Sequence, residues 1–340
     1  MKTLAAIAFA AGVAAAALEG QPPDARQPQV ENARLESRAF AGSLATQVSS
    51  FGAGPFWTAW QEPIIPGRRG DMCWNRGNGD GPDNDGHAVG APVRLEGPTA
   101  LVVLVRIENS QLSQLRVASP DCRFDGGALP FYWINGVPAA ESIAWLRAQL
   151  ADSHADAAIS AIAMHSGQVA DRALDELIAA DQPERVREKT AFWLGTTRGA
   201  PGVDLLKRVL ANDKSEKLRE QVVFALSQSK ERAGMAAVLD TARNDKDPRI
   251  RSRALFWIAQ RAASQQARDA INGAIENDPE RSVKEQAVFA LKQLPEDQGV
   301  PLLINVAKNN PDPAVRKKAI FWLGQSKDPR ALEFFAQILK

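Results

Sequence analysis

The chain has 340 residues, of which 45% are hydrophobic, so it holds enough apolar material for two or more packed units. It carries 41 Lys and Arg residues against 40 Asp and Glu residues. The resulting net charge of +1 argues against a general nucleic-acid binder, which needs an excess of cations to displace counterions from phosphates. The near-equal numbers of basic and acidic residues are compatible only with a local patch of Lys and Arg side chains.

Residues 1–20 have the pattern of a secretory signal peptide. A short positive start that contains Lys2 precedes an alanine-rich apolar run from Leu4 to Leu18. This run is shorter than the ~20 residues of a comfortable membrane span, so an uncleaved anchor is the less favoured alternative. No later stretch of the sequence is long and apolar enough to span a bilayer. We therefore expect the signal to be removed and the protein to be exported, to the periplasm or as a secreted protein.

Two cysteines, Cys73 and Cys122, follow the predicted signal. Because export places them in an oxidising compartment, we expect them to form a disulfide rather than two buried thiols. A thiol-redox role would favour a close C-x-x-C pair, and these two residues are far apart in the sequence.

Residues 21–138 are predicted to form a small β-rich domain. An alternating stretch at 30–40 favours a strand, and residues 71–74 are predicted to form another. Short β-branched runs at 101–107 and 112–117, separated by turn residues, predict an antiparallel meander.

Tryptophans are concentrated in this region, and two of them lie in a turn-rich stretch at 51–60. We expect them to fill the core of the β-rich domain, and an aromatic platform for a ligand is the alternative. The four residues are Trp57, Trp60, Trp74 and Trp133.

A Gly- and Asp-rich segment at 75–91 suggests a calcium-binding loop at first sight. The EF-hand frame does not fit it, because with Gly86 at position 6 the frame places Gly81 at position 1 and Pro92 at position 12. We therefore expect a solvated loop between strands.

From residue 186 onward one pattern recurs five times, and its copies begin at 186, 218, 250, 283 and 315. The intervals of 32 or 33 residues indicate stacked repeats. Counting back by the same interval gives a degenerate earlier copy at 154–165. Each copy is predicted to hold two helices, with Asp and Pro in the turns before many of them. We therefore predict a mainly α protein, in which residues 139–340 form an α-solenoid of about six two-helix repeats preceded by the β-rich domain.

The last copy reads Asp-Pro-Ala-Val-Arg-Lys-Lys-Ala-Ile-Phe-Trp-Leu-Gly over residues 312–324. With one residue fewer between Pro and Val, it resembles the Asp-Pro-x-x-Val-Arg-x-x-Ala-x-x-x-Leu-Gly motif of HEAT-type repeats, in particular the short variety named for phycobilisome lyases. The whole layout is similar to that of exported bacterial HEAT-repeat proteins. The resemblance covers roughly residues 150–340 and implies a surface that binds another protein. It implies no lyase activity, because a fold does not carry a function.

Three columns of equivalent positions run through the copies. A helical wheel places the Trp column in the apolar stripe, and Trp alternates there with Ala in adjacent copies, so we expect these rings to interdigitate in the core. A basic column is interpreted as a polar ladder between copies that uses the turn Asp residues, with an anion-binding strip as the alternative. The columns are Trp193, Trp257 and Trp322, and Arg187, Arg219, Arg251, Lys284 and Arg316.

The third column holds a Phe in every copy from 186 onward, on the side of the wheel opposite the apolar stripe. We expect neighbouring helices to cover these rings, because a helix inside a solenoid has partners on several sides. The alternative is an exposed apolar ridge, which would be the candidate partner-binding site. The residues are Phe192, Phe224, Phe256, Phe289 and Phe321.

The sequence shows no catalytic constellation. Its three histidines are His87, His154 and His165, and it lacks H-E-x-x-H, paired C-x-x-C, P-loop and G-x-S-x-G motifs. We expect no enzymatic activity, no cofactor and no metal. The predicted function is an exported, non-catalytic scaffold that binds a protein partner and no nucleic acid. The alternative is a ligand-binding or enzymatic β-rich module that the repeats position.

Overall fold

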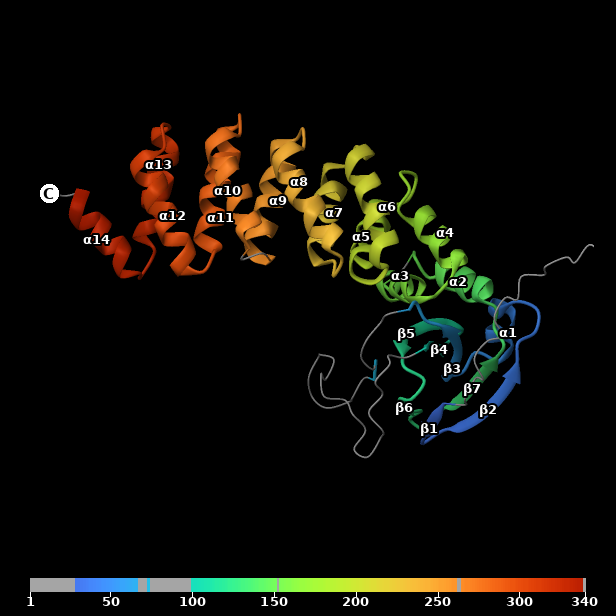
Figure 1. Cartoon of the computed structure of the whole chain (residues 1–340). Helices are drawn as coiled ribbons and strands as arrows, with labels where there is room; N and C mark the ends of the chain where they lie inside the picture. Colours follow the sequence, from blue (N-terminus) through green and yellow to red (C-terminus); the bar gives the residue numbers. More distant parts are fainter. Residues whose placement is uncertain (1–27, 67–71, 74–98, 152, 262–263, 339–340) are drawn as a thin grey trace, which may run out of the picture.

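The computed structural model describes residues 28–66, 72–73, 99–151, 153–261 and 264–338. In this part of the chain a β-sheet region precedes helices that follow one another along an extended array (Figure 1). This arrangement confirms the predicted mainly α solenoid behind a β-rich domain. The predicted signal at 1–20, Trp74 and the loop at 75–91 lie outside the described residues.

The β-rich region contains a five-stranded mixed sheet. Its strand order is β2-β7-β3-β4-β5, in which β7 is parallel to both β2 and β3, whereas β3, β4 and β5 are antiparallel. The predicted meander is therefore correct for β4 and β5, and the turn-rich stretch at 51–60 proves to enter a strand, β3. The strands are β2 (Arg34–Ala39), β3 (Phe56–Pro63), β4 (Ala100–Glu108), β5 (Gln111–Ala118) and β7 (Pro130–Asn135), and a separate parallel pair joins β1 (Gln29–Glu31) to β6 (Arg123–Asp125).

The sheet is buried on both faces at its strands β3 and β4, which explains why β4 reads as a nearly continuous apolar run. One face carries Trp60, Leu101 and Val103, which also contact the first helices of the array and share one hydrophobic core with them. The other face carries Trp57 and Trp133 in a smaller, separate core. The short helix α1 (Leu44–Ser50) packs against α2 beside the first face.

The predicted disulfide is present. Cys73 and Cys122 are bonded, and their Cα atoms are 5.2 Å apart. The strand predicted at 71–74 is wrong for its two described residues, which have no regular structure. Met72 is held instead by a hydrogen bond of 2.8 Å from its backbone N–H to the hydroxyl of Ser119.

Replacing both cysteines with Ser should lower the free energy of unfolding by about 3–4 kcal/mol, because the bond closes a long loop in the unfolded chain. Urea denaturation of the double variant beside the wild type measures this loss. Reduced wild-type protein is the control and should lose the same amount. A loss below about 1 kcal/mol would contradict the expectation.

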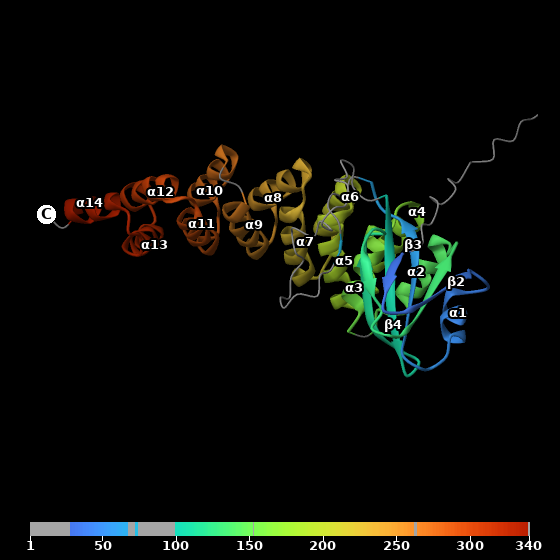
Figure 2. The same cartoon turned by 90° about the horizontal axis from the view of Figure 1, so that it is seen from below.

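The helical array holds six two-helix copies, from α3/α4 to α13/α14, as predicted. Figure 2 shows the odd-numbered helices of the array along one side and the even-numbered helices along the other. The helix α2, which precedes the first copy, begins at Ala139. The helices are α2 (Ala139–Arg147), α3 (Ala155–Met164), α4 (Gln168–Leu177), α5 (Glu184–Thr197), α6 (Gly199–Asn212), α7 (Glu216–Gln228), α8 (Arg232–Asn244), α9 (Pro248–Arg261), α10 (Gln265–Asn277), α11 (Arg281–Gln293), α12 (Glu296–Asn309), α13 (Pro313–Gly324) and α14 (Pro329–Ile338).

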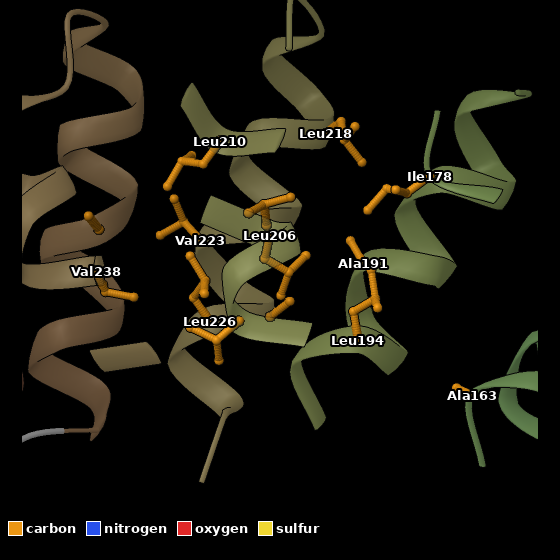
Figure 3. Packing of buried hydrophobic residues seen from close by; sticks show 14 of the residues in the cluster. Ala163, Ile178, Ala191, Leu194, Leu206, Leu210, Leu218, Val223, Leu226 and Val238 are labelled. Atoms are coloured by element: carbon orange, nitrogen blue, oxygen red, sulfur yellow. The ribbon is translucent and has the colours of Figure 1, made fainter. Parts of the chain in front are cut away.

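Close packing between copies depends on small and aliphatic residues at equivalent positions. Figure 3 shows Leu194, Leu206 and Leu226, from α5, α6 and α7, among the buried side chains between these helices. The approach of α5 to α7 is tightest at Gly195, where a Cβ would lie 2.3 Å from the carbonyl oxygen of Ala225. A side chain at this position would push the two helices apart.

The basic column forms the expected ladder between copies. Arg219 donates to Asp245 of the next turn at 2.5 Å and to the Leu210 carbonyl, and Arg251 binds Asp278 through two hydrogen bonds of 2.7 and 2.8 Å. Arg187 pairs with Asp213 in the same way. Lys284 donates instead to the backbone carbonyl of Glu276 on α10, and Arg316 donates to those of Asn310 and Pro311 in the turn before α13.

Candidate functional site

The Phe column lies on the odd-numbered helices α5 to α13. Phe192, Phe224, Phe256 and Phe289 are half-buried, and Phe321 is 53% exposed. Neither expectation from the sequence therefore holds for the whole column. The neighbouring copies cover each ring in part and leave its remaining surface at the outside of the array.

The Trp column lies beside the Phe column instead of deep in the core. The ring of Phe224 is 4.6 Å from that of Trp257 and 6.0 Å from that of Phe192, and the ring of Phe289 is 5.1 Å from that of Trp322. A Trp of one copy thus lies against a Phe of the preceding copy. We call this row of rings the aromatic ridge. It consists of Phe192, Trp193, Phe224, Phe256, Trp257, Phe289, Phe321 and Trp322.

The expectation that these Trp rings are core residues is wrong, because all three are half-buried. The buried side of α9 is formed by Arg251, Ala254, Leu255 and Ile258, and Ile250 lies at its edge. A helical wheel advances by about 100° per residue. A wheel that takes Ile250 as the centre of the apolar stripe therefore misplaces that centre by roughly a quarter turn from the side that is buried. This shift places Trp257 at the margin of the stripe.

The indole N–H groups of the ridge differ in their partners. Trp193 donates to Asp156 at 3.3 Å. The N–H groups of Trp257 and Trp322 are buried and have no acceptor among the described residues.

Rows of charged side chains run beside the ridge and link successive copies. Glu220 pairs with Arg253 at 2.7 Å, Glu188 pairs with Lys217 at 2.6 Å, and Glu216 pairs with Arg249. These pairs are exposed, so each contributes only about 0–1 kcal/mol to stability. Their carboxylates and cations border the ridge at the surface.

The basic column takes no part in this surface. The side chains of Arg187, Arg219 and Arg251 are each 7% exposed and are engaged with the Asp residues of the ladder. The anion-binding strip considered as an alternative is therefore wrong for these three residues, because their donors point into the junctions between copies.

The three described tryptophans of the β-rich region fill its core as expected. Trp60 and Trp133 are fully buried and Trp57 is 8% exposed, so they form no ligand platform. Two surface hollows lie elsewhere, one of about 460 Å³ between α2 and α4 and one of about 430 Å³ beside Ile65 and the turns that follow α5 and α7. None of the tryptophans lines either hollow.

A buried polar chain connects the sheet to the first copy. The indole N–H of Trp60 donates to the hydroxyl of Ser142 at 2.8 Å, this hydroxyl lies 2.9 Å from Nε2 of His165, and Nδ1 of His165 lies 2.7 Å from the carbonyl of Ala161. The contacts fit a neutral imidazole that accepts from Ser142 and donates to Ala161. Burial lowers the pKa of His165 to about 4. Since Ser142 and His165 are both fully buried, this pair is a structural joint rather than a nucleophile and its base.

Glu62 is a second buried polar group that the sequence did not reveal. It lies on β3 and is 1% exposed, and its Oε1 atom has no hydrogen-bond partner among the described residues. Burial raises the pKa of its carboxyl group to about 8. A carboxyl group in an otherwise apolar strand that is buried on both faces is the signal that could have identified it.

The described residues contain no group of three or more His, Cys, Asp or Glu side chains arranged to hold a metal ion. Within the same ranges, none of the helices is both long and apolar enough to cross a membrane.

The partial burial of the ridge predicts a graded response to substitution. Phe224→Ser should lower the free energy of unfolding by about 1–2 kcal/mol, because it removes a half-buried ring, and Phe321→Ser should lower it by less than about 0.5 kcal/mol. Thermal and urea unfolding of the two variants measure the difference. Leu332→Ser, at an exposed position of α14, is the control. Equal and large losses at Phe224 and Phe321 would show that the ridge is core.

Solved structures with similar folds share little sequence with this chain. One is the complex of CpcE and CpcF of phycocyanin lyase from Nostoc sp., at 18% identity and a TM-score of 0.34, covering 44% of this chain and 97% of that chain. Another is human deoxyhypusine hydroxylase in complex with glycerol, at 15% identity and a TM-score of 0.26, covering 58% of this chain and 90% of that chain. A third is a structure of Kap95p with RanGDP, at 16% identity and a TM-score of 0.34, covering 54% of this chain and 29% of that chain.

The sequence of the helical array matches a known family of repeats. No curated protein matches the chain. The family model described as HEAT repeats matches residues 170–259 and 269–340, which correspond to the array from α4 to the end of the described helices. The helical part of this protein, over residues 170–340, is an array of HEAT repeats.

Proposed function

We propose that this protein is an exported, non-catalytic scaffold that binds another protein through the aromatic ridge of its HEAT repeats. The single observation that carries the proposal is the recurrence of a partly exposed Phe ring on five successive odd-numbered helices, with ring contacts from α5 to α9 and from α11 to α13. Leaving apolar surface in water forgoes roughly 25 cal/mol per Å² of area. A use for the rings explains why every one of these copies keeps a Phe at this position.

The rest of the chain supports the same reading. The β-rich region has a filled core at its described tryptophans, so no observation favours a ligand-binding or enzymatic module there. Export is supported by the signal pattern at 1–20 and by the Cys73–Cys122 disulfide, which is typical of proteins in oxidising compartments. A repeat array offers a long surface to a partner without any catalytic group.

Affinity capture tests the proposal with matched baits. The baits are the chain without residues 1–20, its Phe224→Ser/Phe256→Ser variant, and its Leu332→Ser variant as the control on α14. The expected result is that the unmodified bait and the Leu332→Ser variant recover the same protein from the exported fraction of the source cells, and that the Phe double variant does not. Recovery of that protein by all three baits would contradict the proposal, as would turnover of a small molecule in a screen that recovers no partner.

A further inference from the structure

Charge is distributed unequally between the two sides of the C-terminal half of the array. The odd-numbered helices α9, α11 and α13 carry ten Lys or Arg side chains, of which Arg251 is buried in the ladder, and a single carboxylate, Glu285. The even-numbered helices α10, α12 and α14 carry three Lys or Arg side chains and five carboxylates. The two sets lie on opposite sides of the array (Figure 2), so a chain of net charge +1 has a local cationic side.

The cations of this side share helical faces with the aromatic ridge. Arg253 precedes Phe256 by three positions, Lys292 follows Phe289 by three, and Lys317 precedes Phe321 by four. Residues at these spacings are neighbours on a helix surface. Each of the three helices therefore presents a ring and a cation side by side.

Several of these cations are available to a ligand. Lys292 and Lys317 are exposed, and neither makes an ion pair with a carboxylate of the described residues. The Arg249 and Arg253 side chains pair with carboxylates of α7 but are still 69% and 44% exposed. The cationic character of this side is therefore only partly neutralised within the protein.

The charge changes along the ridge. The helices α5 and α7, at the other end, carry five Lys or Arg side chains against four carboxylates, and Lys217 of α7 pairs with both Glu184 and Glu188 of α5. The aromatic ridge thus runs from a nearly neutral end at α5 to a cationic end at α13. A ligand that follows the ridge meets apolar surface throughout and an excess of cations only at the α9–α13 end.

We propose that the α9–α13 end of the aromatic ridge binds an acidic polypeptide segment in which Asp and Glu alternate with apolar residues. The proposal rests on the function proposed above and adds the chemistry of the partner. The carboxylates of such a segment pair with Lys292 and Lys317, and its apolar side chains pack on Phe289, Phe321 and Trp322. Complementary charge also speeds the encounter and excludes basic partners.

A single-stranded nucleic acid fits this surface less well. Stacking of bases requires open ring faces, and here part of the ring surface is already in contact, because Phe256 meets Trp257 edge-to-face at 5.0 Å and Phe289 is tilted against Trp322 at 5.1 Å. The carboxylates of Glu220 and Glu285 lie in the same rows as the cations and would repel phosphates. A protein segment can space its carboxylates so that they lie opposite the cations and away from these groups.

Fluorescence anisotropy with defined probes tests the proposal on the chain without residues 1–20. The probes are a fluorescein-labelled 20-residue peptide of alternating Glu and Leu, the same peptide with Ser for Leu, the same peptide with Lys for Glu, and a 20-nucleotide oligothymidylate. We expect only the Glu-Leu peptide to bind tightly, and its affinity to fall at least about tenfold in the Lys292→Glu/Lys317→Glu variant. The control variant Lys207→Glu/Arg243→Glu, at exposed positions of α6 and α8, should change that affinity less than about twofold.

The outcomes separate this inference from the function on which it rests. If the Glu-Leu peptide does not bind, or if both charge variants weaken it equally, the inference is overturned, whereas the capture of a partner that depends on Phe224 and Phe256 would still support the scaffold. Preferential binding of the Lys-Leu peptide would likewise overturn the inference without contradicting the scaffold. Binding of the oligothymidylate that is lost in the Lys292→Glu/Lys317→Glu variant would overturn both proposals.

Discussion

Replacing Glu62 with Gln should raise the free energy of unfolding at pH 8 by roughly 4 kcal/mol. Burial raises the pKa of Glu62 from 4.5 to about 8 in the folded protein. The unfolded chain therefore loses this proton at a lower pH than the folded chain. The contribution of the protonated group to stability is complete below pH 4.5 and is lost as the pH rises towards 8. A Gln side chain keeps the neutral form at every pH and removes this loss.

The clearest window for the measurement lies between pH 6.5 and 8, because His165 has the opposite dependence. The pKa of His165 is lowered from 6.5 to about 4, so its effect on stability is felt only as the pH falls below 6.5. In the higher window the wild type should lose about 1 kcal/mol per pH unit through Glu62, and the Glu62→Gln variant should not.

Urea unfolding at pH 6.5, 7.2 and 8 compares the two proteins. Glu333→Gln is the matched control, because Glu333 is exposed on α14, and it should change stability by less than about 0.5 kcal/mol. A Glu62→Gln variant that is less stable than the wild type at pH 8 would contradict this account of Glu62, since it would mean that the native site holds a compensated carboxylate.

Asp278→Ala should lower the free energy of unfolding by about 3–5 kcal/mol, because it leaves the guanidinium of Arg251 buried without its carboxylate partner. The side chains of Arg251 and Asp278 are 7% and 5% exposed, and two hydrogen bonds join them. The same Asp also accepts a hydrogen bond from the backbone N–H of Glu280 at 2.9 Å, which fixes the turn before α11.

In the next copy an uncharged residue occupies the ladder position of Asp278. Asn310 takes the position of Asp278 there and still accepts a hydrogen bond from the backbone N–H of Asp312 at 3.0 Å. The double variant Arg251→Met/Asp278→Asn should therefore recover stability to within about 1–1.5 kcal/mol of the wild type. Arg281→Ala, which removes an exposed partner of Asp312, is the control and should cost less than about 1 kcal/mol. A loss below about 1 kcal/mol for Asp278→Ala would show that the ladder is solvated in solution.

The repeat array was predictable because its information is local and periodic. Each copy carries its own turn, its own apolar stripe and its own basic residue, so the interval of 32 or 33 residues revealed both the number of copies and the ladder. The disulfide was predictable from the compartment implied by the signal pattern. These inferences need no knowledge of which distant segments meet.

The features that the sequence did not reveal depend on long-range contacts. The parallel pairing of β7 with β2 and β3 joins segments far apart in the chain, and the Trp60–Ser142–His165 joint brings together a strand, a helix and the end of another helix. The half-burial of Phe224 and Trp257 depends on the spacing of adjacent copies, which a wheel drawn for one helix does not contain. The charge difference between the two sides of the array was present in the sequence but required the helices to be assigned to sides.

Site-specific photo-crosslinking tests the central claim most directly, since it maps which side of the array a captured partner touches. A photoreactive amino acid is placed at Gln260 and Gln325, four positions after Phe256 and Phe321, and in separate variants at Lys207 and Arg243 on α6 and α8. We expect crosslinks to one partner from the first two positions and none from the second two. Crosslinks from α6 and α8 alone would place the binding surface on the even-numbered side and contradict the claim that the aromatic ridge binds the partner.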